Sequence, residues 1–239
     1  MRRMRTMRYL LTGMLAVLLG ACSNDPPQGP APAPKPAAAP VAGTVVVAMG
    51  DSLTAGYGLG ESEAYPAQLE ARLRADGRRV RVVNAGISGE TSSGALSRVD
   101  WVVQRLDPDL VILVTGANDG LRGITPAVLE ENLRALVGRL RQSGATVVLG
   151  GMKMVRNLGI HYTRAYDSIY PQIAREFDLV LIPFFLEGVA GQAYLNQSDG
   201  IHPNAKGYRK VVEHIYPFVK QALDAKAARA GHRRAGQFY

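Results

Sequence analysis

The chain has 239 residues, 47% of them hydrophobic, so it is long enough to bury a substantial core. Its net charge of +8 would suit a nucleic-acid partner if the charge lay on the folded part. Eight of the 28 basic residues lie within residues 1–21 and 226–239, which hold no acidic residue. The other 20 basic residues equal the 20 acidic residues in number, so the rest of the chain has no net charge. This argues against a nucleic-acid partner.

Residues 1–21 have the pattern of an export signal. Arginines precede the apolar run YLLTGMLAVLLGA, which is too short for a membrane-spanning helix. The run ends in Leu-Gly-Ala before Cys22, the only cysteine of the chain, and this sequence resembles the bacterial lipobox. We therefore predict that Cys22 is lipidated and anchors the protein to a membrane. The alternative is an ordinary cleaved secretory signal followed by an incidental free thiol.

Residues 22–43 are predicted to form a linker between this anchor and the folded domain. Ser23, rather than an aspartate, follows Cys22, which by the lipoprotein sorting pattern indicates an outer-membrane lipoprotein facing the periplasm or the cell surface. The segment SNDPPQGPAPAPKPAAAP is rich in proline and alanine. Such a sequence forms an extended spacer, here of roughly 50–60 Å when fully stretched.

From Gly43 onward, strand and helix patterns alternate. Helical spacing of apolar residues begins at Tyr65, at Pro126, at Tyr162 and after Pro203. Continuous apolar runs predict five buried parallel strands, at Val45–Met49, Val80–Val83, Leu110–Thr115, Thr146–Gly150 and Leu179–Ile182.

This alternation predicts one three-layer α/β/α domain over residues 44–225, built on a parallel sheet. Residues 226–239 are expected to form a solvated basic tail with frayed structure. Active sites of such folds lie beyond the carboxyl ends of the strands.

Polar residues follow the first three predicted strands. They are Ser52, the segment NAGISGETSSG over 84–94, and the segment TGANDG over 115–120. A fourth cluster, SDGIHPN over 198–204, precedes the last helix. All of them should meet at one edge of the sheet.

These clusters hold the residue types that acyl transfer needs. A serine is a weak nucleophile unless a base lies within hydrogen-bond reach and a third group orients that base. Asp199 and His202 are three residues apart, so the carboxylate can hold one imidazole nitrogen while the other faces Ser52. We therefore predict a catalytic triad of Ser52, His202 and Asp199. Ser52 taken alone would instead be interpreted as a turn or cap residue.

An oxyanion hole requires hydrogen-bond donors aimed at the developing negative charge. We assign this role to the backbone N–H groups of Ser52 and Gly89 and to the side-chain amide of Asn118. Gly89 suits a place where the backbone approaches the substrate without a Cβ. Asp51 and Asp119 are expected to hold nearby loop amides through local hydrogen bonds.

Four blocks in this order resemble those of the SGNH (GDSL-type) hydrolases: Gly50–Leu53, Gly89, Gly116–Asp119 and Asp199–Pro203. Segments such as GETSSGALSRV, IYPQIAREF and PFFLEGV are similar to the periplasmic thioesterase, lysophospholipase and arylesterase group of that superfamily. The resemblance implies a flavodoxin-like fold with five parallel strands, and neither metal nor cofactor. Ala117 departs from it, since glycine is common there.

The predicted activity is that of a serine esterase that forms an acyl-enzyme. Its expected substrates are acyl esters such as aryl esters and lysophospholipids, ahead of thioesters, because acyl-CoA is scarce outside the cytoplasm. We expect a monomer. Two alternatives stay open: a carbohydrate or peptidoglycan O-deacetylase on the same fold, and a catalytically silent ligand-binding lipoprotein. A binding protein would not need Ser52, His202 and Asp199 together.

The acyl chain is expected to lie in an apolar groove. Leu121, Ile124 and a predicted loop over 154–162 are its candidate walls, unless both segments are ordinary connections. Trp101 and the tyrosines within 162–170 are interpreted as packing residues. The scattered histidines offer no metal-ligand spacing, and His161 and His214 are expected on the surface or on helix faces.

Overall fold

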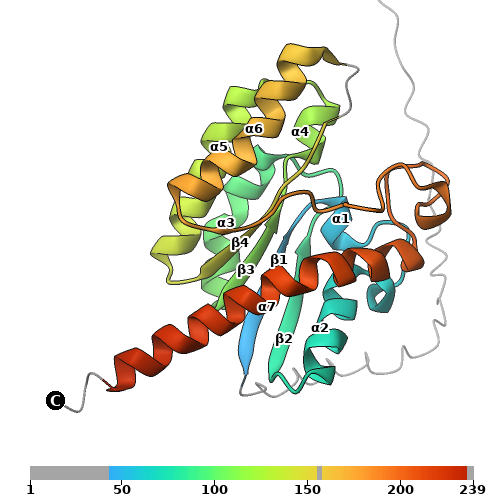
Figure 1. Ribbon diagram of the computed structural model, residues 1–239. Coiled ribbons are helices and arrows are strands. Elements are labelled where there is room, and N and C mark those ends of the chain that lie inside the picture. Colours follow the sequence, from blue (N-terminus) through green and yellow to red (C-terminus); the bar gives the residue numbers. More distant parts are fainter. Residues whose placement is uncertain (1–42, 155–157, 236–239) are drawn as a thin grey trace, which may run out of the picture. The chain divides into compact units, whose positions relative to one another are not determined.

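The computed structural model describes residues 43–154 and 158–235 (Figure 1). The predicted signal, Cys22 and nearly all of the linker therefore lie outside the described residues. Five parallel strands form one sheet, as predicted. The strands are β1 (Thr44–Gly50), β2 (Val80–Gly86), β3 (Leu110–Val114), β4 (Thr146–Gly150) and β5 (Val180–Ile182).

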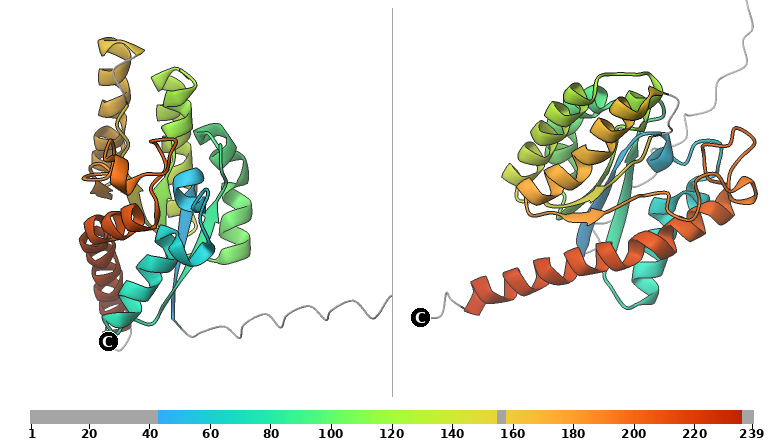
Figure 2. Two further views of the ribbon diagram at one scale, coloured as in Figure 1. Left: turned by 90° about the vertical axis from the view of Figure 1, so that its right-hand side faces the viewer. Right: turned by 45° about the horizontal axis from the view of Figure 1, so that its top comes forward.

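Helices cover both faces of the sheet (Figures 1 and 2). One layer contains α3 (Ser92–Leu106), α5 (Pro126–Gln142) and α6 (Ile160–Glu176). The other contains α2 (Tyr65–Ala75) and α7 (Ala205–Ala235). Every residue of β3 is buried, which explains why the central strands are continuous apolar runs rather than alternating ones.

The strand order β2-β1-β3-β4-β5 is the flavodoxin-like order that the sequence resemblance implied. The chain leaves β1 toward β2 and then crosses to β3 on the other side, so the crevice between these connections is the expected ligand site. Gly50 is paired in register with both Gly86 and Val114. Strands β1, β2 and β3 therefore end level, and the residues that follow them open on one edge.

Short helical turns in the connections include α1 (Ser52–Ala55), α4 (Ala117–Leu121), η1 (Glu61–Glu63) and η3 (Ala193–Leu195). Helix α6 begins at Ile160, so the predicted loop over 154–162 is shorter than expected, and residues 155–157 lie outside the described residues. No helix among the described residues is long and apolar enough to cross a bilayer.

Helix α3 was not among the predicted elements. Thr91 caps its start by accepting a hydrogen bond from Gly94 N, and Ala95, Val99 and Val102 bury one helical face. Trp101 lies on this helix and is 61% exposed, so the prediction that it packs in the core was wrong. The tyrosine prediction is confirmed for Tyr166 and Tyr170, which are fully buried.

Helix α7 continues to Ala235, ten residues beyond the predicted end of the domain at residue 225. The segment is rich in alanine, lysine and arginine, which are strong helix formers. The Lys226 ammonium lies 3.1 Å from Asp109 Oδ1, while Asp109 Oδ2 accepts a hydrogen bond from Val45 N. The first part of the expected tail is therefore ordered helix attached to the sheet.

Candidate active site

Ser52 lies directly after β1, at the start of α1. Position 50, just before this turn, requires glycine because a Cβ there would lie only 2.2 Å from the Val114 carbonyl oxygen. Asp51 caps the turn, since its Oδ1 accepts a hydrogen bond from Leu53 N at 3.0 Å. From α7, the Tyr208 hydroxyl donates to the Leu53 carbonyl oxygen at 2.9 Å. The sequence Gly-Asp-Ser thus fixes the serine at the carboxyl edge of the sheet.

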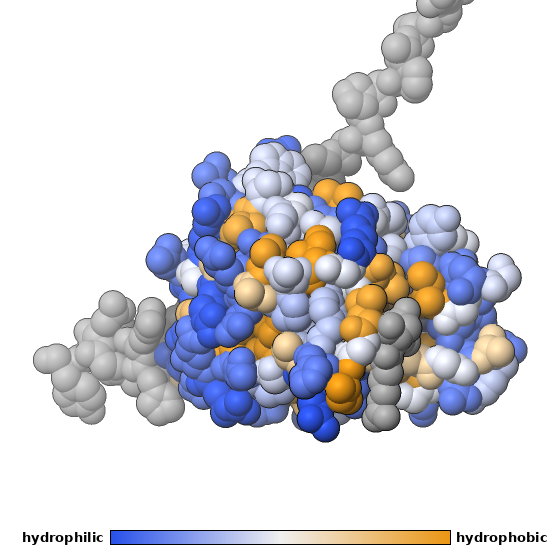
Figure 3. Space-filling model, turned by 90° about the horizontal axis from the view of Figure 1, so that it is seen from above, coloured by the Kyte–Doolittle hydropathy of each residue, from blue (hydrophilic) through white to orange (hydrophobic). Residues whose placement is uncertain are grey.

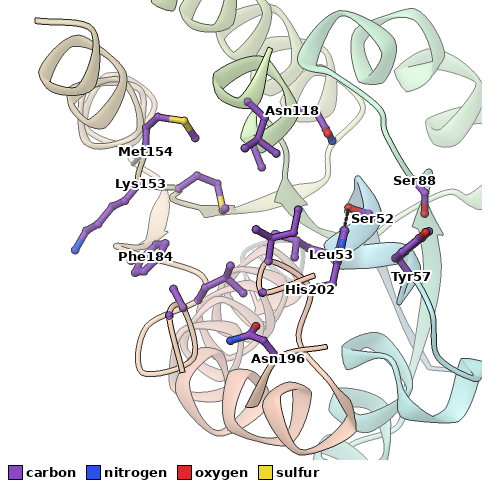
Figure 4. Close-up of a pocket in the computed structure, with 18 of the residues that line it drawn as sticks. Ser52, Leu53, Tyr57, Ser88, Asn118, Lys153, Met154, Phe184, Asn196 and His202 are labelled. Carbon is purple, nitrogen blue, oxygen red and sulfur yellow. Dashed lines mark hydrogen bonds between the residues drawn. The ribbon is translucent and has the colours of Figure 1, made fainter. Parts of the chain in front are cut away.

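The structure brings the three predicted triad residues together, and Figure 4 shows the contact between Ser52 and His202. His202 Nε2 lies 2.8 Å from Ser52 Oγ, although the two residues are 150 positions apart. His202 Nδ1 lies 2.7 Å from Asp199 Oδ2. Asp199 Oδ1 accepts hydrogen bonds from the backbone N–H groups of Ile201 and His202, both at 3.0 Å. An imidazole held by a carboxylate therefore contacts the serine hydroxyl, which is the geometry of general-base activation.

The two carboxylates near Ser52 have opposite electrostatic environments. Hydrogen bonds from the His202 side chain and backbone lower the pKa of Asp199 to about 2. Burial raises the pKa of Asp51 to about 6. Asp199 is thus fully ionised at neutral pH and can stabilise an imidazolium, whereas Asp51 contacts Leu53 N and lies 3.4 Å from Asn118 Nδ2.

Three possible oxyanion donors line the same pocket as Ser52 Oγ. Gly89 lies between β2 and α3 with φ +80°, a backbone conformation that favours glycine. The backbone N–H groups of Ser52 and Gly89 donate to no acceptor within the described part of the chain. Asn118 lies in α4, where its Nδ2 donates to the Glu90 carbonyl oxygen at 2.9 Å.

Buried polar side chains support the turn that carries Asn118. The Tyr166 hydroxyl donates to the Gly116 carbonyl oxygen at 2.8 Å, and the Tyr170 hydroxyl donates to the Thr115 carbonyl oxygen at 2.9 Å. Asp119 accepts hydrogen bonds from Ser92 N and Ser92 Oγ, at the start of α3. The expectation that Asp119 holds nearby amides is thus corrected, because its partner lies 27 positions away.

A pocket of about 410 Å³ opens beside Ser52. Seen from the carboxyl edge, apolar residues gather near the middle of this face (Figure 3). Tyr57 and Ser88 lie on one side of Ser52, while Met154, Lys153 and Phe184 lie on the other (Figure 4). The apolar lining includes Leu121, Met152, Met154, Phe184, Leu186 and Ile201.

The predicted walls of the groove therefore agree only in part with the residues that line the pocket. Leu121 and Met154 line the pocket, but Ile124 does not; its carbonyl oxygen accepts a hydrogen bond from the Tyr162 hydroxyl. Ala117, the departure from the family pattern, is also a lining residue. The sequence reasoning missed Tyr57, whose ring centroid lies 4.7 Å from that of His202. It also missed Met152 and Phe184, although Phe184 belongs to the quoted segment PFFLEGV.

His161 and His214 do not line this pocket. His161 is exposed, and His214 is half-buried with Nε2 3.0 Å from the Phe184 carbonyl oxygen. Within residues 43–154 and 158–235 no cluster of three or more histidine, cysteine or acidic residues has metal-site geometry.

The chain was compared with known proteins. It is 40% identical over 182 residues to esterase TesA of Pseudomonas aeruginosa, a match that covers 76% of this chain and 90% of that protein. It is 39% identical over 163 residues to thioesterase 1/protease 1/lysophospholipase L1 of Escherichia coli K12, covering 68% and 77% of the two chains.

The crystal structure of TesA matches with a TM-score of 0.72, at 39% identity, over 75% of this chain and 99% of that chain. The family model for GDSL-like lipases and acylhydrolases matches residues 48–210, which include Ser52, Gly89, Asn118, Asp199 and His202. The chain therefore belongs to the GDSL-like lipase/acylhydrolase family, as its four sequence blocks predicted.

Proposed function

We propose that the protein is a serine esterase that hydrolyses carboxylic acyl esters through an acyl-enzyme on Ser52. The observation that carries this proposal is the chain of contacts from Ser52 Oγ to His202 Nε2 at 2.8 Å and from His202 Nδ1 to Asp199 Oδ2 at 2.7 Å. Membership of the acylhydrolase family supports the same reaction class.

In the proposed reaction, Ser52 Oγ attacks the ester carbonyl carbon while His202 Nε2 takes the hydroxyl proton. Ionised Asp199 holds the imidazole and stabilises the imidazolium that forms. The N–H groups of Ser52 and Gly89 and the Asn118 amide bind the oxyanion. His202 then protonates the departing alkoxide, which leaves an acyl ester on Ser52. Water, activated by His202, hydrolyses this ester and releases the carboxylic acid.

The pocket supports apolar acyl chains as the substrate class. Its lining is mostly apolar and includes leucine, methionine and phenylalanine side chains, which favour burial of hydrocarbon. We propose that oxygen esters, including aryl esters and lysophospholipids, are better substrates than thioesters. An acetyl group would leave most of this apolar surface uncovered, so a deacetylase role for the pocket is disfavoured.

The test of the nucleophile is Ser52→Ala. The variant should fold normally because it removes one half-buried hydroxyl, yet it should lose p-nitrophenyl ester hydrolysis and labelling by a phosphonate probe. Retained ester turnover would overturn the assignment. A series of p-nitrophenyl esters from acetyl to dodecanoyl should give its highest kcat/KM above acetyl. A maximum at acetyl would instead favour the deacetylase.

We further propose that the protein is exported and anchored to the outer membrane through lipid on Cys22. This proposal depends on the signal-like run and lipobox-like sequence before Cys22. Cells that express the full chain should incorporate labelled palmitate into it, and Cys22→Ser should abolish the label. Equal labelling of both forms, or a protein released in soluble form from wild-type cells, would contradict the anchor.

A further inference from the structure

We propose that Arg98 is a positioning residue for ester hydrolysis, which holds the segment that carries Gly89 against the turn that carries Ser52. This inference rests on the proposed esterase function and deepens it. Arg98 lies on α3 and does not line the pocket, so it has no contact with the substrate in this arrangement.

The guanidinium of Arg98 joins three segments of the chain. Its Nε and Nη2 lie 2.6 and 2.7 Å from the two carboxylate oxygens of Glu90. Nη2 also donates to the carbonyl oxygen of Ala85 at 2.8 Å and, more weakly, to that of Gly50 at 3.3 Å. Ala85 lies at the end of β2, and Gly50 lies at the end of β1, two residues before Ser52. Glu90 directly follows Gly89.

Glu90 links Arg98 to the third oxyanion donor, Asn118. Its backbone carbonyl oxygen accepts the hydrogen bond from Asn118 Nδ2 at 2.9 Å. Its backbone N–H donates to Ile87 O at 3.1 Å, and Ile87 N in turn donates to Gly50 O at 2.9 Å. Each of the three oxyanion donors is therefore close to this network. Ser52 lies two residues after Gly50, Gly89 directly precedes Glu90, and Asn118 donates to Glu90 itself.

The ion pair is shielded from water. The Arg98 and Glu90 side chains are 15% and 6% exposed, respectively. A buried ion pair contributes little net stability compared with well-packed apolar residues, because desolvation of both charges offsets their attraction. A planar guanidinium does, however, fix the direction of several hydrogen bonds at once, which an ammonium does not. Geometry is therefore the contribution that we assign to Arg98.

The first experiment compares Arg98→Lys with the wild-type full-length protein, using p-nitrophenyl butyrate. Because small misplacements of catalytic groups are costly, kcat should fall by about 10- to 100-fold while KM changes by less than about threefold. The rate of phosphonate labelling of Ser52 should fall in parallel. The matched control is Arg139→Lys, since Arg139 pairs with exposed Asp100 at 2.9 Å on the surface, and its kcat should be unchanged.

A second variant separates positioning from folding. In Arg98→Met/Glu90→Leu the buried pair is replaced by apolar side chains, so the melting temperature should stay close to that of the wild type or rise. Its kcat should nevertheless remain as low as that of Arg98→Lys. Wild-type kcat in either variant, with Ser52→Ala inactive, would overturn the role of Arg98 and leave the esterase function standing. Activity in Ser52→Ala would instead overturn the function itself.

Discussion

The acid–base part of the site and the oxyanion part are built in different ways. Asp199 and His202 lie in a turn whose hydrogen bonds are mostly internal, and the Asp199 side chain is 36% exposed. Around the oxyanion donors, Asp51, Ser92 and Asp119 are almost completely buried. Their hydrogen bonds, with those of Arg98, connect β1, β2, α3 and α4.

This difference matches the two chemical tasks. Groups that stabilise a developing charge are most effective when they are fixed before the reaction and shielded from water. A general base must exchange protons with substrate and solvent, and the His202 side chain lines the pocket, where it can do so. The activity of the acid–base part should therefore depend little on the packing behind it, whereas the oxyanion part should couple activity to that packing.

The largest expected effect comes from breaking the acid–base part with His202→Ala. We expect kcat to fall by about 10⁴-fold or more, because Ser52 loses its base. The turn should persist, since Gln197 N still donates to the backbone carbonyl oxygen of residue 202. Because the triad acts as a unit, Ser52→Ala/His202→Ala should be no less active than either single variant. Multiplicative losses in the double variant would contradict a shared mechanism.

A smaller effect is expected from the oxyanion part with Asn118→Ala. The loss of one donor should lower kcat by about 10²- to 10³-fold with little change in KM. Steady-state kinetics with p-nitrophenyl butyrate would measure both constants. A decrease in kcat below tenfold, or an effect confined to KM, would mean that the Asn118 amide only binds Glu90 and does not reach the oxyanion.

The smallest expected effect is a pH-dependent difference in stability between the wild type and Asp51→Asn, which tests the burial of the oxyanion part. Burial raises the pKa of Asp51 from 3.8 to about 6, so the folded state binds a proton more tightly than the unfolded state does. The wild type should therefore lose stability relative to Asp51→Asn as the pH rises from 4 to 7. The gap should then level off at about 1–3 kcal/mol, given about 1.4 kcal/mol per pKa unit.

Urea unfolding at pH 4, 5.5 and 7.5 would measure this gap, with Asp199→Asn as the matched control. The lowered pKa of Asp199 gives the opposite sign, since its stabilisation is present above the unfolded pKa and is lost as the pH falls through about 2. The control should show only a small trend of reversed direction over this range. A gap for Asp51→Asn that is constant with pH would contradict the burial of its charge.

Much of the fold could be predicted from the sequence because its signals are local. The five strands are recognisable as apolar runs, and the predicted strand at Thr146–Gly150 has the same bounds as β4. Helix α3 was not predicted because its first residues belong to the polar segment 84–94, although Thr91 and the spacing of Ala95, Val99 and Val102 indicate a capped amphipathic helix. Helices α1 and α4 are too short to show a period.

Contacts within the site could be predicted from the sequence only where both residues belong to one short motif. The Asp199–His202 pair forms within one turn, so three positions of separation suffice to predict it. The pairing of Arg98 with Glu90 depends on how α3 packs behind the strand ends, and 28 basic and 20 acidic residues offer too many possible pairs. The same holds for Phe184 and Met152, whose place in the pocket depends on distant segments.

The nucleophile and its base are 150 positions apart, which has a consequence while the chain is still being synthesised. A polypeptide that is still being synthesised, or that ends before residue 202, contains the serine but not the imidazole. It cannot attack esters in the compartment where it is made. Regain of turnover during refolding would therefore report that the final turn has docked onto the assembled sheet.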